Sequence, residues 1–286
     1  MGKCISFHSY KGGTGKTTLA VNFSTLLASR GYKVFLLDLD FYAPSLFSYF
    51  DFDPKYWIND YLVNNADIDN IMVDMKELLP VKMKGDLFVA FSKGGKEDIY
   101  QLEGNLANDR DRQLTQFRNF ISMREDLLLN RNADFIVMDT SPGIRYWSIN
   151  SIVISDIILL TLKMGDLDLK GTIKMVQDIY GSLIEYGSVC KLLLNRVAGY
   201  CTPPALKDTK NLTFNVVADD SSFKSKINDA INNTIDQSFE VSTITDIPCY
   251  CDIQFKEREY LTALEYPAHP FTQKINDLAD KISNYL

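Results

Sequence analysis

The sequence of 286 residues predicts an α/β fold, in which a doubly wound, mainly parallel sheet carries helices on both faces. Strand-like apolar runs alternate with segments of helical periodicity, and neither a repeat nor a linker interrupts them. Two runs, at 33–38 and 134–139, are almost continuously apolar and end in an acid, which is typical of parallel strands buried on both faces. We therefore expect one domain over residues 1–286.

The first strand is expected at 3–8 and the first helix at 19–30, with a start near Lys16. The last helix, at 272–286, has apolar residues along one side but few basic ones, so it should pack on the domain and not on a membrane. Between them we expect strands at 33–38, 86–91, 134–139, 156–162, 189–195 and 212–217, helical segments at 57–63, 68–79, 109–132, 148–155, 170–186, 221–235 and 256–263, and surface loops at 93–104 and 202–204.

Composition narrows the classes of function. Hydrophobic residues make up 46% and charged residues 23% of the chain, as in ordinary globular proteins. No apolar run is long enough to cross a bilayer and the N-terminus enters a strand directly, so we expect a cytoplasmic protein. The net charge of −7 does not support DNA as a partner, although a local basic patch would allow it. Five cysteines, an odd number, predict free thiols.

The segment at 9–18, Ser-Tyr-Lys-Gly-Gly-Thr-Gly-Lys-Thr-Thr, lies between the first strand and the first helix and is typical of a phosphate-binding loop. Its glycines let the backbone aim N–H groups inward, and the helix adds its positive dipole end. Lys16 would reach the β- and γ-phosphates, and the Thr17 hydroxyl would be a ligand of Mg²⁺. The predicted nucleotide contacts are Gly12, Gly13, Thr14, Gly15, Lys16, Thr17 and Thr18.

The loop departs from the usual pattern, because Tyr10 stands where a glycine is expected, and a second lysine, Lys11, precedes the paired glycines. In this the chain resembles the ParA/MinD family of P-loop ATPases with a deviant Walker motif. The resemblance implies ATP and Mg²⁺ as cofactors. It also implies that Lys11 crosses a dimer interface to the partner's nucleotide.

Three acids stand at the ends of the two buried strands or just after them. The carboxyl ends of parallel strands should lie beside the phosphate loop, so Asp139 would face Mg²⁺ through a water. After it, Gly143 has no side chain that would keep its N–H from a γ-phosphate. The family resemblance implies that Asp40 orients the attacking water and that Asp38 lies in the outer shell of Mg²⁺. The alternative for Asp38 and Asp40 is a role as helix caps.

Two further positions match the family where it contacts adenine. Asn195 and Arg196 stand at the end of the strand at 189–195, and Pro248 lies in a segment that resembles the loop closing over the base. The alternative for Asn195 is a turn-forming residue.

The resemblance implies a dimeric switch in which ATP brings two subunits face to face and slow hydrolysis, stimulated by an unidentified activator or cargo protein, separates them. Such switches partition or position DNA or a cellular complex, and the catalytic residues would be Lys11, Lys16 and Asp40. The alternative is an ATPase that inserts metal ions or iron–sulfur clusters, with Cys249 and Cys251 forming a four-sulfur site across the dimer. A scaffold with little hydrolysis is a third hypothesis.

Overall fold

The computed structural model describes residues 2–79, 81–104, 109–163, 165–176, 179, 188–197, 242–255 and 257–285. The expected loop at 202–204, strand at 212–217, helix at 221–235 and most of the second half of the helix at 170–186 lie outside these residues.

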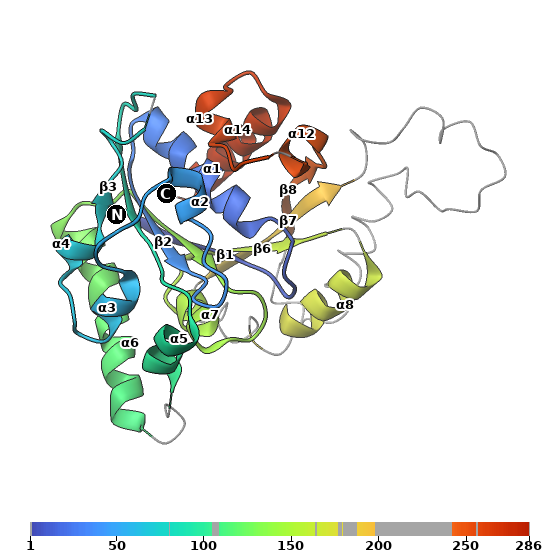
Figure 1. The fold of residues 1–286 in the computed structure, drawn as a ribbon. Helices are drawn as coiled ribbons and strands as arrows, with labels where there is room; N and C mark the ends of the chain where they lie inside the picture. Colours follow the sequence, from blue (N-terminus) through green and yellow to red (C-terminus); the bar gives the residue numbers. More distant parts are fainter. Residues whose placement is uncertain are drawn as a thin grey trace, which may run out of the picture.

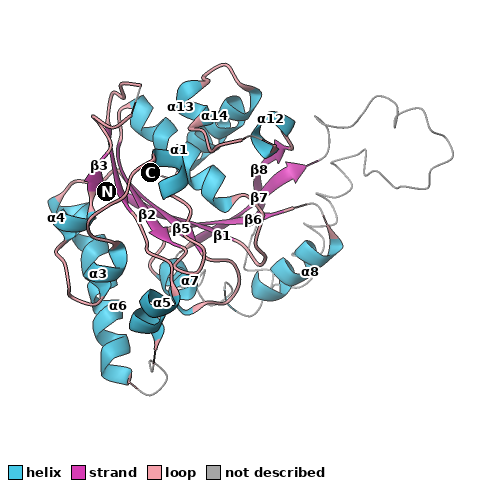
Figure 2. Ribbon diagram, in the orientation of Figure 1, coloured by secondary structure: helices cyan, strands magenta, loops and turns pink. Residues whose placement is uncertain are grey.

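In the described part of the chain, eight strands form one sheet in the order β3-β4-β2-β5-β1-β6-β7-β8 (Figure 2). Neighbouring strands run parallel except for β3 and β4, so the predicted doubly wound, mainly parallel sheet is confirmed. The strands are β1 (Lys3–His8), β2 (Lys33–Leu39), β3 (Val73–Asp74), β4 (Asp86–Ala90), β5 (Phe135–Thr140), β6 (Ile157–Leu162), β7 (Val189–Val197) and β8 (Ser242–Pro248).

Helices cover both faces of the sheet (Figure 1). One layer contains α1, α12, α13 and α14, and the other contains α3, α5, α6, α7 and α8. The helices are α1 (Lys16–Arg30), α2 (Phe47–Phe50), α3 (Ile58–Leu62), α4 (Ile68–Ile71), α5 (Lys96–Glu103), α6 (Arg110–Glu125), α7 (Tyr146–Val153), α8 (Asp166–Met175), α12 (Cys251–Gln254), α13 (Thr262–Glu265) and α14 (Pro270–Ser283), with a π-helical turn at Asp126–Asn130.

The central strand β1 shows how the sheet is buried. Cys4 points into the core beneath α6 and α7, whereas Ile5 and Phe7 point into the core beneath α1 and α14, and all three are fully buried. The chain leaves β1 toward β2 on one side and later reaches β6 on the other. This reversal places a crevice at the carboxyl ends of the strands, where doubly wound sheets bind their ligands.

Helix α14 packs on the domain, as the sequence predicts. Its apolar side, with Ile275, Leu278, Ala279 and Ile282, is fully buried against α1 and β8. None of the helices in the described residues has an apolar stretch long enough to cross a bilayer.

Several expected elements are wrong. The segment at 93–104 is not all loop, because α5 begins after Gly95 and anchors itself through buried Leu102. The expected helix at 256–263 is replaced by the short α13, because residues 257–261 run in an irregular path toward the ligand crevice. Neither β3 nor β8 is expected from the sequence, and Pro248 ends β8 although it is expected in a loop. Both strands lie at sheet edges, where apolar patterning is weak.

Candidate functional site

The loop between β1 and α1 holds the side chain of Lys16 by a hydrogen bond. The Lys16 side chain is buried, and its Nζ donates to Ser9 Oγ at 2.9 Å, while Ser9 Oγ donates to the Lys11 carbonyl at 2.6 Å. Gly15 caps α1 with φ 89°, a left-handed conformation that favours glycine. A Cβ atom there would also lie 2.5 Å from Asn195 Nδ2. The predicted helix start near Lys16 is therefore confirmed, and the loop lies between β1 and α1 as expected.

The buried lysine faces carboxylates. Burial lowers the pKa of Lys16 from its usual value, and the charges of Asp139 and Asp40 oppose that shift. A lysine in this environment has lost much of its hydration, so an anion entering the loop meets a cation that is poorly shielded by water.

Asp38 and Asp139 lie in register on the neighbouring strands β2 and β5. Each is buried, and Asp38 Oδ2 and Asp139 Oδ1 have no hydrogen-bond partner. Burial, followed by the charge of Asp139, raises the pKa of Asp38 well above its usual value. Burial also raises the pKa of Asp139 to about 7, against the charge of Lys16 and a hydrogen bond from Thr17. Oxygen atoms of this kind beside a threonine hydroxyl fit the ligand preference of Mg²⁺.

Asp40 is held at the mouth of the loop by two donors. Ser141 Oγ donates to Asp40 Oδ1 at 2.7 Å, and the Ala43 N–H donates to the same oxygen at 3.2 Å. The segment after β5 also contacts the phosphate loop, because the Gly143 N–H donates to the Ser9 carbonyl at 2.8 Å. Contact between this N–H and a γ-phosphate therefore requires that bond to open.

Lys11 lies on the outer side of the loop, near helix α8. Its Nζ is 3.6 Å from Asp168 Oδ1, and its side chain is 43% exposed. The ring of Tyr10 packs on Gly171 of the same helix, where any Cβ atom would overlap the ring. The two residues that depart from the usual loop pattern thus both contact α8.

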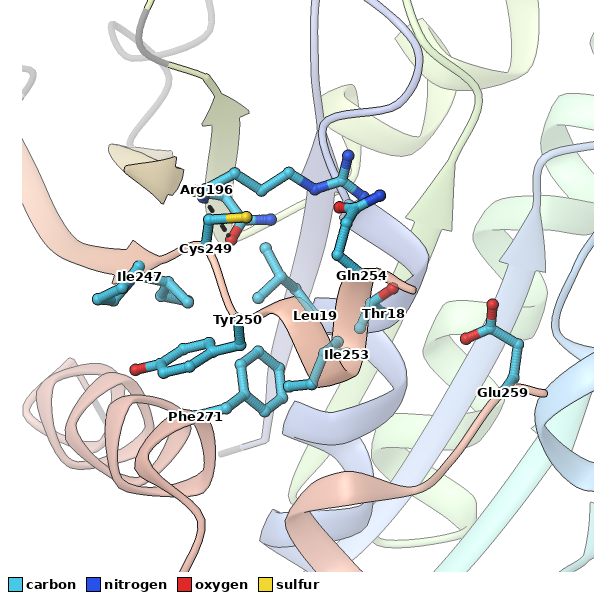
Figure 3. A pocket seen from close by; sticks show the side chains of 13 residues that line it. Thr18, Leu19, Arg196, Ile247, Cys249, Tyr250, Ile253, Gln254, Glu259 and Phe271 are labelled. Atoms are coloured by element: carbon cyan, nitrogen blue, oxygen red, sulfur yellow. Dashed lines mark hydrogen bonds between the residues drawn. The ribbon is translucent and has the colours of Figure 1, made fainter. Parts of the chain in front are cut away.

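The predicted adenine contacts gather around a pocket of about 190 Å³ beside the loop (Figure 3). Asn195 Nδ2 donates to the Thr14 carbonyl at 2.7 Å, and Asn195 Oδ1 accepts from the Arg196 N–H at 2.9 Å. Arg196 has φ 57°, an uncommon conformation for a residue other than glycine. Pro248 lies on the neighbouring strand β8 and also lines the pocket.

A second pocket, of about 440 Å³, is lined by the phosphate loop together with Asp40 and Ser141. It meets the first pocket at four shared residues, Gly15, Thr18, Arg196 and Glu259. Glu259 and Tyr49 also line this site but are not expected there from the sequence. The Tyr49 hydroxyl and Thr18 Oγ1 are hydrogen-bonded at 2.8 Å. No local motif marks Glu259 or Tyr49, because they reach the site from irregular or very short segments.

The two neighbouring cysteines do not form a pair of thiols. Cys249 is not in a disulfide, whereas Cys251 is disulfide-bonded, which corrects the expectation of a free thiol at Cys251. The described residues also contain no group of three or more His, Cys, Asp or Glu side chains placed to hold a metal ion by themselves. The structure therefore gives no support to a four-sulfur site.

Comparisons with known proteins agree with this geometry. The family model described as AAA domain (AAA_31) matches residues 2–185. An uncharacterised protein of Methanocaldococcus jannaschii is 25% identical over 61% of this chain, and the match spans 64% of that protein. The chromosome-partitioning ATPase Soj of Treponema pallidum is 24% identical over 66% of this chain and 70% of its own.

Among solved structures, the cell-division ATPase MinD of Pyrococcus furiosus superposes with a TM-score of 0.70 over 100% of both chains, at 20% identity. That likeness establishes a common fold. Together with the family model, which matches well over half of the residues, and with the lysine-rich phosphate loop and its two strand-end carboxylates, it shows that this chain belongs to the ParA/MinD family of P-loop ATPases.

Proposed function

We propose that the protein binds and hydrolyses ATP with Mg²⁺ and works as a dimeric switch that partitions or positions a cargo. One observation carries the proposal: the unpartnered carboxylate oxygens of Asp38 and Asp139 lie at the strand ends beside the buried Lys16. Unpartnered acceptors beside a desolvated cation are costly unless a ligand uses them. A polyphosphate with its divalent cation uses both.

The charge and position of each residue in the site indicate its role in ATP hydrolysis. Lys16 and the N–H groups of the loop would neutralise the phosphates. Thr17, with Asp38 and Asp139 behind it, would hold Mg²⁺, which when bound adds positive charge beside the β- and γ-phosphates. Asp40, fixed by Ser141, would orient the attacking water.

The position of Lys11 supports a role between subunits. Its ammonium group lies outside the phosphate loop and is partly exposed, whereas Lys16 occupies the inside. A second copy of the chain facing this surface could therefore receive Lys11 at its own nucleotide. The cargo and activator are proposed only as a class, because relatives are named for chromosome partitioning and for cell division.

Light scattering tests the switch directly. The mass of the parent, Asp40→Ala and Lys11→Ala proteins is measured with Mg²⁺ and ATP, with ADP and without nucleotide, and phosphate release is followed in parallel. We expect a dimer only with ATP, retained in Asp40→Ala and lost in Lys11→Ala. A mass that does not respond to any nucleotide in the parent would overturn the dimeric mechanism.

A further inference from the structure

The segment that carries Asp40 has no helix or strand structure of its own. It covers residues 40–46, between β2 and α2, and is called the Asp40 segment below. Ser141 holds its first residue by the hydrogen bond to the Asp40 carboxylate. An irregular segment has many accessible conformations, and each further contact removes some of them. The contacts made by the rest of the segment therefore bear on where Asp40 stands.

The side chain of Tyr42, two positions after Asp40, lies between a carboxylate and a guanidinium group. Its hydroxyl donates to Glu103 Oε2 at the end of α5, and the Arg145 guanidinium lies over its ring, 4.4 Å from the ring centroid. Burial, followed by the hydrogen bond to Glu103, raises the pKa of Tyr42 to about 12. The hydroxyl therefore keeps its proton near neutral pH and remains a donor to the Glu103 carboxylate.

The loop before α5 also packs on the Asp40 segment. A Cβ atom at Gly94 would lie 2.6 Å from Pro44 Cδ, so a larger residue there would require a shift of the proline or of the loop. The stretch 94–103, which contains α5, thus contacts the segment at two points, Pro44 through Gly94 and Tyr42 through Glu103.

Helix α5 is separate from both pockets of the site. None of its residues lines either pocket, whereas Tyr42 lines the pocket of about 440 Å³ together with Asp40. The other oxygen of the Glu103 carboxylate, Oε1, is buried without a hydrogen-bond partner. A hydrogen bond to a charged and partly buried acceptor is among the stronger ones, so the bond from Tyr42 favours one conformation of the segment.

We propose that the hydrogen bond from Tyr42 to Glu103 positions Asp40 for ATP hydrolysis, so that α5 influences the rate of the catalytic step without lining the nucleotide pockets. This inference rests on the proposed function and adds to it a pair of positioning residues that act through Asp40. Loss of the bond lowers the fraction of molecules in which Asp40 is in place, and the rate falls with that fraction.

Steady-state ATP hydrolysis tests the proposal, because it separates the catalytic step from nucleotide binding. kcat and the KM for ATP, with Mg²⁺, are measured by phosphate release for the parent, Tyr42→Phe, Glu103→Ala, Glu103→Gln and the double variant Tyr42→Phe/Glu103→Ala. Glu97→Ala, at an exposed position in the first turn of α5, is the matched control. kcat is expressed per nucleotide-binding site, so an unfolded fraction does not imitate a loss of rate.

Because a hydrogen bond to a charged group is lost, we expect Tyr42→Phe and Glu103→Ala each to lower kcat about tenfold, with KM within about twofold of the parent. The double variant should have the kcat of Glu103→Ala, because both substitutions delete the same bond. Glu103→Gln keeps an acceptor, so its kcat should lie within about threefold of the parent. Glu97→Ala should match the parent.

A parental kcat in Tyr42→Phe or in Glu103→Ala overturns the proposal while ATP hydrolysis stands. A double variant whose loss is the product of the two single losses does the same, as does an effect confined to KM. Failure of the parent to hydrolyse ATP overturns the proposed function and this inference with it.

Discussion

Asp38 and Asp139 lie side by side in register on adjacent parallel strands, and each has one buried carboxylate oxygen without a hydrogen-bond partner. Two such groups side by side disfavour one another's ionised form, so the nucleotide-free site stores an electrostatic cost. A divalent cation at this point removes the cost, which couples the stability of the fold to the occupancy of the site.

The stability of the nucleotide-free protein should therefore fall between pH 5 and pH 8. The pKa of Asp139 in the folded state is about 7, above the unfolded value near 3.8, so the stabilising contribution is complete below the unfolded pKa and is lost as the pH rises through the folded one. Asp139→Asn should flatten this decline. At pH 8 its free energy of unfolding should exceed that of the parent by at most about 4 kcal/mol, so its melting temperature should be higher. Melting curves in EDTA measure it.

The exposed Asp277 of α14 supplies the control for this measurement. Asp277→Asn should leave the decline with pH unchanged. An Asp139→Asn protein that keeps the full decline would contradict the assignment, because Asp38 would then carry the whole effect.

Asp40→Ala should lower the rate of ATP hydrolysis by about a hundredfold or more, since a group that positions or deprotonates the nucleophile is lost. Ser141→Ala removes only the 2.7 Å hydrogen bond that fixes Asp40, so we expect a smaller loss, about tenfold. Phosphate release under saturating ATP gives both rates. Equal rates for Asp40→Ala and the parent would rule out the assigned role.

The ion pair between Lys11 and Asp168 should contribute little to holding Lys11 on its own subunit. The pair is 3.6 Å long and the lysine side chain is 43% exposed, so it is worth less than about 1 kcal/mol. Asp168→Asn should lower the ATP concentration needed for half-dimerisation by less than about fivefold, as measured by light scattering. Loss of the dimer in this variant would instead show that Asp168 is required at the interface.

Asn22 of α1 links this helix to α13 through hydrogen bonds of its side chain. Its buried Nδ2 donates to the Thr18 carbonyl at 2.8 Å, and its Oδ1 accepts from the Ala263 N–H at 2.7 Å. Asn22→Ala leaves that N–H without its partner, so we expect a loss of about 1–3 kcal/mol in the free energy of unfolding. Denaturant titration measures it, and Gln273→Ala, at an exposed position of α14, is a comparison in which the loss should be smaller.

The sequence predicts the elements whose signals are local. Strand β2 is a continuous apolar run, and the phosphate loop is a short motif of glycines and lysines, so both are found where expected. Tyr49 escapes prediction because its role arises from a contact with Thr18, 31 positions before it in the chain. Glu259 escapes because it lines both pockets from an irregular segment that carries no local motif. Strand β8 escapes because its polar residues are compatible with an edge position only once β7 is placed beside it.

The contact between Tyr10 and Gly171 links the composition of the phosphate loop to that of a distant helix. With the Tyr10 ring in its present place a larger residue at position 171 would overlap it, so such a residue requires this partly exposed ring to move, whereas a glycine at position 10 would release that constraint. We expect the two positions to covary among related chains, so that an aromatic residue at one is accompanied by glycine at the other. A change at position 10 of the loop would then be accompanied by a change at position 171 of α8, so the residue at 171 would indicate which form of the motif a related chain carries.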